Sequence, residues 1–332
     1  MRPNRKTLIA AAAVLGLYVV IELLRQTNVL DGYWQQVMDL SLIITISALG
    51  LSLIYGFAGQ FSLGHAAFYG IGAYTSGFIT KSYGDTPFWF ILALIAGVTA
   101  AMVAAFLIGL PILRLKSDYL GIATLGFGII VKVVLDNTDK WAPIMGGSRG
   151  MLGIPHLTTF AWVFWLTVAA VLLCRNLILS SHGRAMITVR EDEVAADIMG
   201  IDTTQSKTLA FVVGCGLAGL AGGLYSHLYP FLHPTSFDFL KSLDVLLVVV
   251  LGGLGSLTGT VVTAVAWVFL LEGLRILPEA FLEWRGVLYA LLLVVVMITR
   301  PQGLMGGKEW SLYKSKGSSA APGKGGNSRA SA

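Results

Sequence analysis

The stretch HGRAMITVREDEVAADIMGIDTTQSK, from His182 to Lys207, is the only long polar interval between two strongly apolar blocks of this chain. It contains start and stop patterns for a short helix. Thr188 and Glu191 have the spacing of a capping box, and Gly200 is suited to end a helix, so the pattern predicts a helix between them. Such pairs also occur in ordinary polar connectors, which remain the alternative interpretation.

The predicted helix, Val189 to Met199, is amphipathic. Its charged residues lie away from an apolar face that carries Val194, Ala195, Ile198 and Met199. Asp202 with Gln205 forms a second predicted cap, which opens the next apolar segment. The helix therefore offers an apolar stripe to another surface.

The composition indicates a membrane protein. The chain has 332 residues, of which 55% are hydrophobic and 12% charged, whereas soluble domains carry roughly 25% charged residues. Both cysteines, Cys174 and Cys215, lie within apolar segments, so neither a disulfide framework nor a metal site is indicated. The net charge of +5 does not indicate nucleic-acid binding, because four of the 23 basic residues lie in a Gly, Ser and Ala tail beyond Trp310.

Apolar stretches of the length needed to cross about 30 Å of hydrocarbon recur along the chain. They predict an all-α, polytopic fold with about ten transmembrane helices. The predicted spans are Leu8 to Leu24, Met38 to Phe57, Phe61 to Thr80, Phe88 to Leu113, Tyr119 to Leu135, Ala161 to Leu179, Leu209 to Tyr229, Leu243 to Leu251, Leu257 to Leu274 and Val287 to Thr299. The eighth is too short to cross alone, so we expect a half-helix or a start near Phe237.

The distribution of basic residues predicts the orientation. More of them fall in inner than in outer segments if the N-terminus is cytoplasmic, which follows the positive-inside rule. This places the polar loop, residues 180–207, and both termini in the cytoplasm. We expect one transmembrane domain over residues 1–307 and a disordered basic tail over 308–332.

A glycine-rich segment, GFAGQFSLGHAAFYGIGAY at Gly56 to Tyr74, is expected to turn sharply and re-enter the membrane. Interrupted helices expose backbone groups to a cavity, which gives a polar solute a route past lipid. The candidate pathway residues are Gln60, Ser62, Gly64, His65 and Tyr69. The alternative is that the glycines allow close helix packing, with His65 hydrogen-bonded inside the bundle.

Two segments resemble one another. Leu49 to Tyr74 and Leu243 to Trp267 each contain an apolar run, a glycine-rich turn and another apolar run. The turns read GFAGQFSLG and LGGLGSLTG. A duplicated transporter half would have this pattern, and so would chance similarity in a chain with 39 glycines.

Charged residues in the spans are few and peripheral. Lys132 with Asp136, and Glu272 with Arg275, have the spacing of pairs on one helix face. We expect interfacial anchoring for these residues and for Asp39 and Asp244, although intramembrane charges are also candidates for ion sites. An ion-coupled carrier would more often have carboxylates near mid-membrane, so this pattern weakens that alternative.

Catalysis by the chain itself is not indicated. No G-x-x-x-x-G-K-[ST] phosphate-binding loop is present in the sequence, so we expect no ATP hydrolysis by this chain. No serine and histidine have a recognisable catalytic spacing, which argues against an intramembrane hydrolase. We therefore predict no catalytic residues, no metal and no bound cofactor.

Six motifs resemble the permease subunits of branched-chain amino acid ABC importers, of the LivM type. The similarity covers about Val37 to Gly303. The motifs are GQFSLGHAAFYGIGAY at Gly59 to Tyr74, LRLKSDYLGIATLGFG at Leu113 to Gly128, GRAMITVREDEVAADIMGI at Gly183 to Ile201, LAGLAGGLY at Leu217 to Tyr225, LGGLGSLTG at Leu251 to Gly259 and RPQGL at Arg300 to Leu304.

The resemblance implies a multi-pass subunit of the bacterial inner membrane and a set of partners. These are a second, homologous permease of the LivH type, two cytoplasmic ABC ATPases that use ATP and Mg, an extracytoplasmic substrate-binding protein and membrane lipid. It implies a substrate as well, namely leucine, isoleucine and valine. Related permeases carry urea, short amides or other amino acids, so these remain alternatives.

The resemblance also implies a role for the polar loop, because importer permeases place a short cytoplasmic helix in a groove of the ATPase. Ala195, Ala196 and Gly200 match the Ala-Ala-x-x-x-Gly part of the coupling motif, whereas Glu193 stands one residue further upstream than in the usual Glu-Ala-Ala. The candidate coupling residues are Arg184, Arg190, Glu191, Glu193, Ala195, Ala196 and Gly200.

Overall fold

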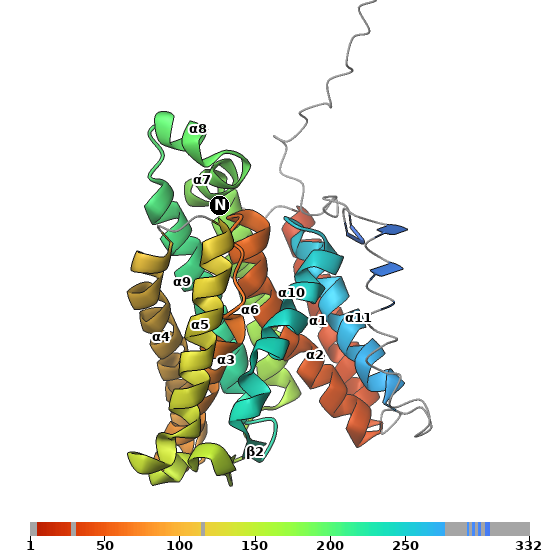
Figure 1. The fold of residues 1–332 in the computed structure, drawn as a ribbon. Helices are drawn as coiled ribbons and strands as arrows, with labels where there is room; N and C mark the ends of the chain where they lie inside the picture. Colours follow the sequence, from red (N-terminus) through yellow and green to blue (C-terminus); the bar gives the residue numbers. More distant parts are fainter. Residues whose placement is uncertain are drawn as a thin grey trace, which may run out of the picture.

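The structure is a computed structural model that describes residues 5–27, 31–113, 117–275, 291, 294–295, 298–299 and 303–305. It is a bundle of helices (Figure 1). The main helices are α1 (Arg5–Gln26), α2 (Gly32–Leu51), α3 (His65–Tyr83), α4 (Pro87–Ile112), α5 (Ser117–Asp136), α6 (Phe160–Leu179), α7 (Ser181–Glu191), α8 (Glu193–Ile198), α9 (Thr203–Ser226), α10 (Phe239–Gly252) and α11 (Leu257–Leu274).

Short elements connect these helices. A π-helix, η1 (Ser52–Phe57), continues α2, and 3-10 turns form η2 (Thr138–Lys140), η3 (Pro143–Met145), η4 (Gly147–Arg149) and η5 (Pro234–Phe237). The strands β1 (Met151–Leu152) and β2 (Phe231–Leu232) pair antiparallel, with Met151 opposite Leu232. This two-residue ladder joins the α5–α6 connection to the α9–α10 connection.

Length and apolar composition confirm a polytopic helical membrane protein. Six helical segments of the described residues are long and apolar enough to cross a membrane. They are Gly32–Phe57, Pro87–Ile112, Tyr119–Asp136, Phe160–Leu179, Thr203–Ser226 and Leu257–Leu274. The predicted count of ten is not confirmed, and most of the predicted span Val287 to Thr299 lies outside the described residues.

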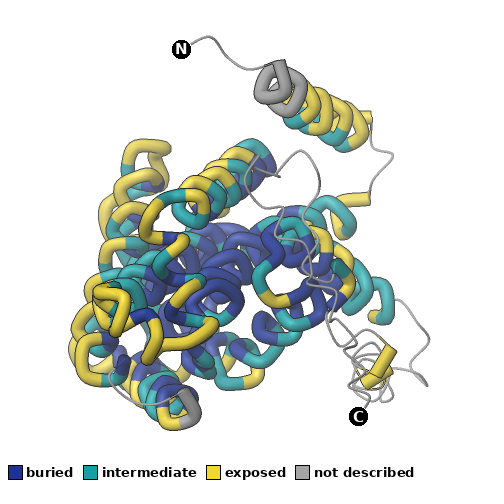
Figure 2. Tube along the Cα trace, turned by 90° about the horizontal axis from the view of Figure 1, so that it is seen from above, coloured by how far each residue is buried: buried dark blue, intermediate teal, exposed yellow. Residues whose placement is uncertain are grey.

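The centre of the bundle is built by α3, α4 and α9, whose backbones meet at glycines. A Cβ on Gly72 would lie 2.1 Å from the carbonyl oxygen of Gly219, and a Cβ on Gly97 would lie 2.9 Å from that of Gly72. Small residues allow the helix backbones to come this close. In lipid, where the hydrophobic effect does not drive helices together, such close packing stabilises their association. Figure 2 shows the buried residues gathered at this centre.

The helix α1 lies at the edge of the bundle, beside the N label in Figure 2. Many of its apolar side chains are exposed, which suits a lipid-facing helix. It is held to the rest by Arg25, which forms an ion pair of 2.7 Å with Asp39 on α2. The guanidinium also lies 4.7 Å from the ring centroid of Phe160 on α6.

The predicted short eighth helix is α10, which has 14 residues and begins at Phe239. At 1.5 Å per residue it extends about 21 Å, less than the hydrocarbon thickness. Ser242 Oγ in its first turn accepts a hydrogen bond of 2.9 Å from the backbone N–H of Ala66, at the start of α3. The predicted shortness is therefore confirmed, and the helix starts between the predicted Leu243 and the alternative near Phe237.

Candidate functional site

The chain reverses between α2 and α3, as the glycine-rich segment predicted. The helix widens into η1, and residues 58–64 are irregular before α3 begins at His65. The N–H of Gln60 donates to Ile54 O at 2.9 Å, and Gly59 has a φ of +70°, which favours glycine. His65 Nε2 lies 3.0 Å from Ser47 O, so the start of α3 lies beside the last turns of α2.

Four of the five candidate pathway residues are buried polar residues in or near this interruption. Gln60, Ser62, His65 and Tyr69 are each at most 3% exposed. Among the described residues, no hydrogen-bond partner is present for either side-chain polar atom of Gln60, for Ser62 Oγ, His65 Nδ1 or Tyr69 OH. Buried polar groups normally have partners. The interruption therefore holds unused donors and acceptors, the chemistry that a polar solute requires.

The fifth candidate, Gly64, has a packing role in the structure. A Cβ there would lie 2.2 Å from Thr124 O on α5. Next to it, the N–H of Leu63 donates to Thr124 Oγ1 at 3.0 Å. The absence of a side chain at Gly64 thus lets α5 approach, which is the close-packing alternative for the glycines.

The polar loop is a pair of helices, and the predicted helix start was wrong. Thr188 lies inside α7, where its hydroxyl donates to Arg184 O at 3.0 Å. The cap of α8 is Asp192, whose Oδ1 accepts from the N–H groups of Val194 and Ala195 at 2.9 and 3.0 Å. Asp192 ends α7 because its backbone is extended, so a predicted single helix becomes α7 and α8.

The predicted helix end and the second cap are confirmed. The φ of Gly200 is +79°, and its N–H donates to Asp197 O at 2.9 Å. Asp202 Oδ1 accepts from the N–H of Gln205 at 2.8 Å at the start of α9. Both features are local consequences of residue type, which explains why the sequence was sufficient.

The apolar stripe on α8 is uncovered in this chain. Val194 is 69% exposed, Ile198 80% and Met199 79%. Ala195 is also exposed, whereas Ala196 is buried and anchors the helix. Figure 1 places α8 at one end of the bundle, beyond the ends of the long helices.

The charged coupling candidates face different surroundings. Arg184 Nη1 donates to the carbonyl oxygen of Leu179, the last residue of α6, at 3.1 Å. Glu193 pairs with Lys207 of α9. Arg190 pairs with Glu191 and also points inward, where its Nη1 donates to Gly56 O of η1 at 2.6 Å.

A cavity of about 300 Å³ lies between the interrupted helix and the polar loop. Gln60 lines it from the interruption, and charged residues line it from the loop and from α9. The lining residues are Ala58, Gly59, Gln60, Leu113, Leu120, Val189, Arg190, Glu191, Asp192, Glu193 and Lys207. The structure thus joins two groups of candidate residues that are about 130 positions apart in sequence.

Of the two charged pairs predicted in the spans, one forms and the other does not. Lys132 forms an ion pair with Asp238, with 2.9 Å between Nζ and Oδ2, and not the predicted pair with Asp136 of its own helix. This contact connects α5 to the N-cap of α10. The spacing of residues within one helix cannot predict a pair between two helices. Glu272 and Arg275 do pair, at 3.5 Å, as predicted.

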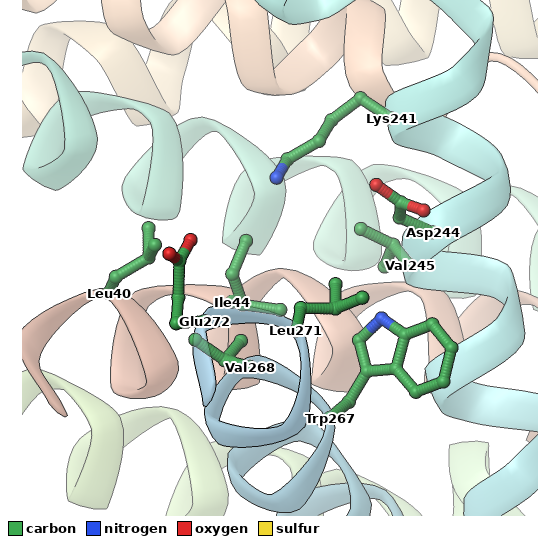
Figure 3. Close-up of a pocket in the computed structure, with 9 residues that line it drawn as sticks. All are labelled: Leu40, Ile44, Lys241, Asp244, Val245, Trp267, Val268, Leu271 and Glu272. Carbon is green, nitrogen blue, oxygen red and sulfur yellow. The ribbon is translucent and has the colours of Figure 1, made fainter. Parts of the chain in front are cut away.

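A second, smaller cavity of about 70 Å³ lies between α2, α10 and α11. Lys241 extends into it, with Asp244 and Glu272 nearby and apolar side chains on the opposite wall (Figure 3). The Glu272 carboxylate accepts a hydrogen bond of 2.7 Å from Tyr33 OH. Lys241 lies in the first turn of α10.

The described residues contain no group of three or more His, Cys, Asp or Glu side chains arranged to hold a metal ion. The two cysteines are buried and unpaired with one another. The candidate site consists of buried hydrogen-bonding groups, closely packed glycines and the exposed helix α8.

Residues 34–297 match the family described as branched-chain amino acid transport system / permease component. The chain belongs to this family. The permease is 36% identical over 303 residues to the high-affinity branched-chain amino acid transport system permease protein LivM of Salmonella typhimurium, with 81% of this chain and 69% of that protein covered. Its identity and coverage with LivM of Escherichia coli K12 are the same.

The second type of relative is more distant. The permease is 27% identical over 286 residues to LivH of Salmonella typhimurium, covering 79% of this chain and 91% of the relative. No solved structure gives a significant match. The similarity to both types of permease supports the family resemblance read from the six motifs, and it identifies the chain as a membrane-spanning transport permease.

Proposed function

We propose that this permease is one membrane subunit of an ATP-driven importer for leucine, isoleucine and valine in the bacterial inner membrane. Its partners are a second permease of the LivH type, two cytoplasmic ABC ATPases and an extracytoplasmic binding protein. ATP and Mg are bound by the ATPases, and this chain binds no cofactor.

The exposed stripe of α8 is the observation that carries this proposal. Large apolar side chains at the end of a bundle lie outside the lipid-facing surface, where exposure to water is unfavourable. Burying Val194, Ile198 and Met199 in a groove of an ATPase removes that cost. The surrounding charges then orient the partner more than they add affinity.

The proposed topology has ten spans in one domain of residues 1–307, followed by a basic, disordered tail of residues 308–332. Both termini and the coupling loop of residues 180–207 are cytoplasmic. The excess of basic residues in the inner segments supports this orientation. The solute path follows the interruption between α2 and α3, where Gln60, Ser62, His65 and Tyr69 carry unused polar groups.

Reconstitution of the permease with its proposed partners in liposomes tests the mechanism. We expect labelled leucine to enter only when ATP is supplied to the ATPase side, and isoleucine and valine to compete with it. Uptake by the permease alone under a proton or sodium gradient would replace this proposal with an ion-coupled carrier. Competition by urea or short amides instead of leucine would change the substrate assignment within the family.

A cysteine crosslinking scan over positions 189–199 tests the docking surface. We expect Val194→Cys and Ile198→Cys to crosslink to the ATPase. Val189→Cys is the matched control, because Val189 is buried in the permease. If no position in the scan contacts the ATPase, the loop is an ordinary connector.

A further inference from the structure

Arg190 connects the coupling loop to the interrupted helix by a direct hydrogen bond. It lies in the last turn of α7, and its Nη1 donates to Gly56 O at 2.6 Å. Gly56 lies near the end of η1, where helix geometry leaves carbonyl groups without intrahelical donors. The guanidinium therefore supplies a donor to the helix end that the interruption creates.

Two glycines with positive φ make room for this side chain. Gly59 has a φ of +70°, and a Cβ there would lie 2.8 Å from Arg190 Cγ. Gly255 has a φ of +82°, and a Cβ there would lie 2.9 Å from Arg190 Nη1. The space around the guanidinium thus depends on glycine in both of the similar turns, GFAGQFSLG and LGGLGSLTG.

The two turns also contact each other. A Cβ on Gly56 would lie 3.1 Å from the backbone N of Gly255. Arg190 therefore sits where the α2–α3 interruption meets the α10–α11 turn. One side chain from the coupling loop thus hydrogen-bonds to the backbone of the first turn and lies beside Gly255 of the second.

The other end of this connection is the exposed stripe. Asp192, two residues after Arg190, caps α8, and Val194 begins the stripe. Met186 and Val189 are buried, and Met186 packs with Ala58 of the interruption and Ala210 of α9. The junction between α7 and α8 is therefore capped by Asp192, and α7 is packed against the interruption and α9.

We infer that Arg190 is a positioning residue that transmits movement of the coupling loop to both glycine-rich turns. This inference rests on the proposed function. It assigns Arg190 an inward role, distinct from a charge that orients the ATPase. It also gives the paired glycine turns a shared function, as the two backbone segments that one guanidinium holds in register.

The test uses the reconstituted complex and measures leucine imported per ATP hydrolysed. For Arg190→Ala we expect ATPase binding and basal hydrolysis to persist while this ratio falls roughly tenfold, because a hydrogen bond from a charged donor is lost. Thr188→Ala is the matched control, since Thr188 lies on the same helix and its exposed hydroxyl donates within that helix, to Arg184 O. It should keep the wild-type ratio.

Arg190→Lys separates the hydrogen bond from packing. Its ammonium can still donate to Gly56 O but lacks the planar fork that also fills the space beside Gly255, so we expect a partial rescue. Equal ratios for the lysine and alanine variants would overturn the inference. So would a wild-type ratio for Arg190→Ala, or loss of ATPase binding in that variant, which would make Arg190 a docking residue.

A complementary substitution covers the case in which Arg190→Ala does not assemble. Gly255→Ala leaves the arginine in place but puts a methyl group against Nη1, so we expect the same loss of coupling with basal hydrolysis retained. A wild-type ratio for Gly255→Ala would overturn the inference. Absence of ATP-dependent uptake by the wild-type complex would overturn the proposed function and the inference with it.

Discussion

A Cβ atom on Gly222 of α9 would lie 1.9 Å from the carbonyl oxygen of Tyr69 on α3. The two helices therefore meet backbone to backbone beside a candidate pathway residue. On the other face of the contact, a Cβ on Gly219 would lie 2.6 Å from Ala101 Cβ of α4. The position of Tyr69 is thus set by glycines that no side chain can replace without moving a helix.

We expect Gly222→Ala to lower the stability of the isolated permease by about 1 to 3 kcal/mol, the usual cost of overpacking. Thermal unfolding in detergent measures the change. Gly126→Ala on α5 is the matched control, because a Cβ there meets nothing within 4 Å. It should be neutral or slightly stabilising, since alanine favours the helix. Equal behaviour of the two variants would contradict the close contact.

Tyr69→Phe should separate stability from transport. The hydroxyl is buried and has no partner among the described residues, so its removal should raise the free energy of unfolding by about 1 kcal/mol. Leucine uptake by the complex should fall if that hydroxyl serves the solute. Thermal unfolding and uptake are measured on the same preparation.

Tyr74→Phe provides the control for that experiment. The Tyr74 hydroxyl donates to Leu232 O at 3.5 Å, so its loss should not stabilise the permease. Uptake should be near the wild-type rate. Unchanged uptake in Tyr69→Phe would remove Tyr69 from the proposed path.

Much of the fold was accessible from sequence because span length and capping are local properties. The exit from α8 at Gly200 and the cap at Asp202 both follow from neighbouring residues. The division between α7 and α8 did not, because Thr188 and Asp192 are both acceptable caps and only the packed structure selects Asp192. The partners of Lys132 and Arg190 are distant in the chain, so helix periodicity gave no indication of them.

The contact between Lys132 and Asp238 predicts a pH dependence. Two hydrogen bonds hold the pKa of Asp238 below its ordinary value of 3.8. The larger effect comes from the Lys132 ammonium and the smaller from the backbone N–H of Phe239. A lowered pKa means that the folded state favours the carboxylate. This stabilisation is present above the ordinary pKa and is lost as pH falls through the lower, folded-state value.

We expect Asp238→Asn to cost less than about 1 kcal/mol at neutral pH, because the Asp238 side chain is 40% exposed and solvent weakens the ion pair. Asparagine can still cap α10. Asp238→Ala should cost about 1 kcal/mol more, since it also loses the cap. Thermal unfolding across an acid series checks both, and the wild-type advantage over Asp238→Asn should shrink in acid. A difference that grows in acid would contradict the assignment.

Gly200 provides the sharpest test of the coupling loop, because its backbone has requirements that proline cannot meet. Its φ of +79° lies far from the value near −65° that proline fixes, and its N–H donates to Asp197 O. Gly200→Pro should therefore disrupt the exit from α8 and reduce substrate-stimulated ATP hydrolysis and uptake together. Membrane insertion should survive, because the change lies between α8 and α9. Gly200→Asn is the control, since asparagine tolerates this conformation and retains the N–H. Wild-type coupling in Gly200→Pro would show that the orientation of α8 relative to α9 does not carry the movement.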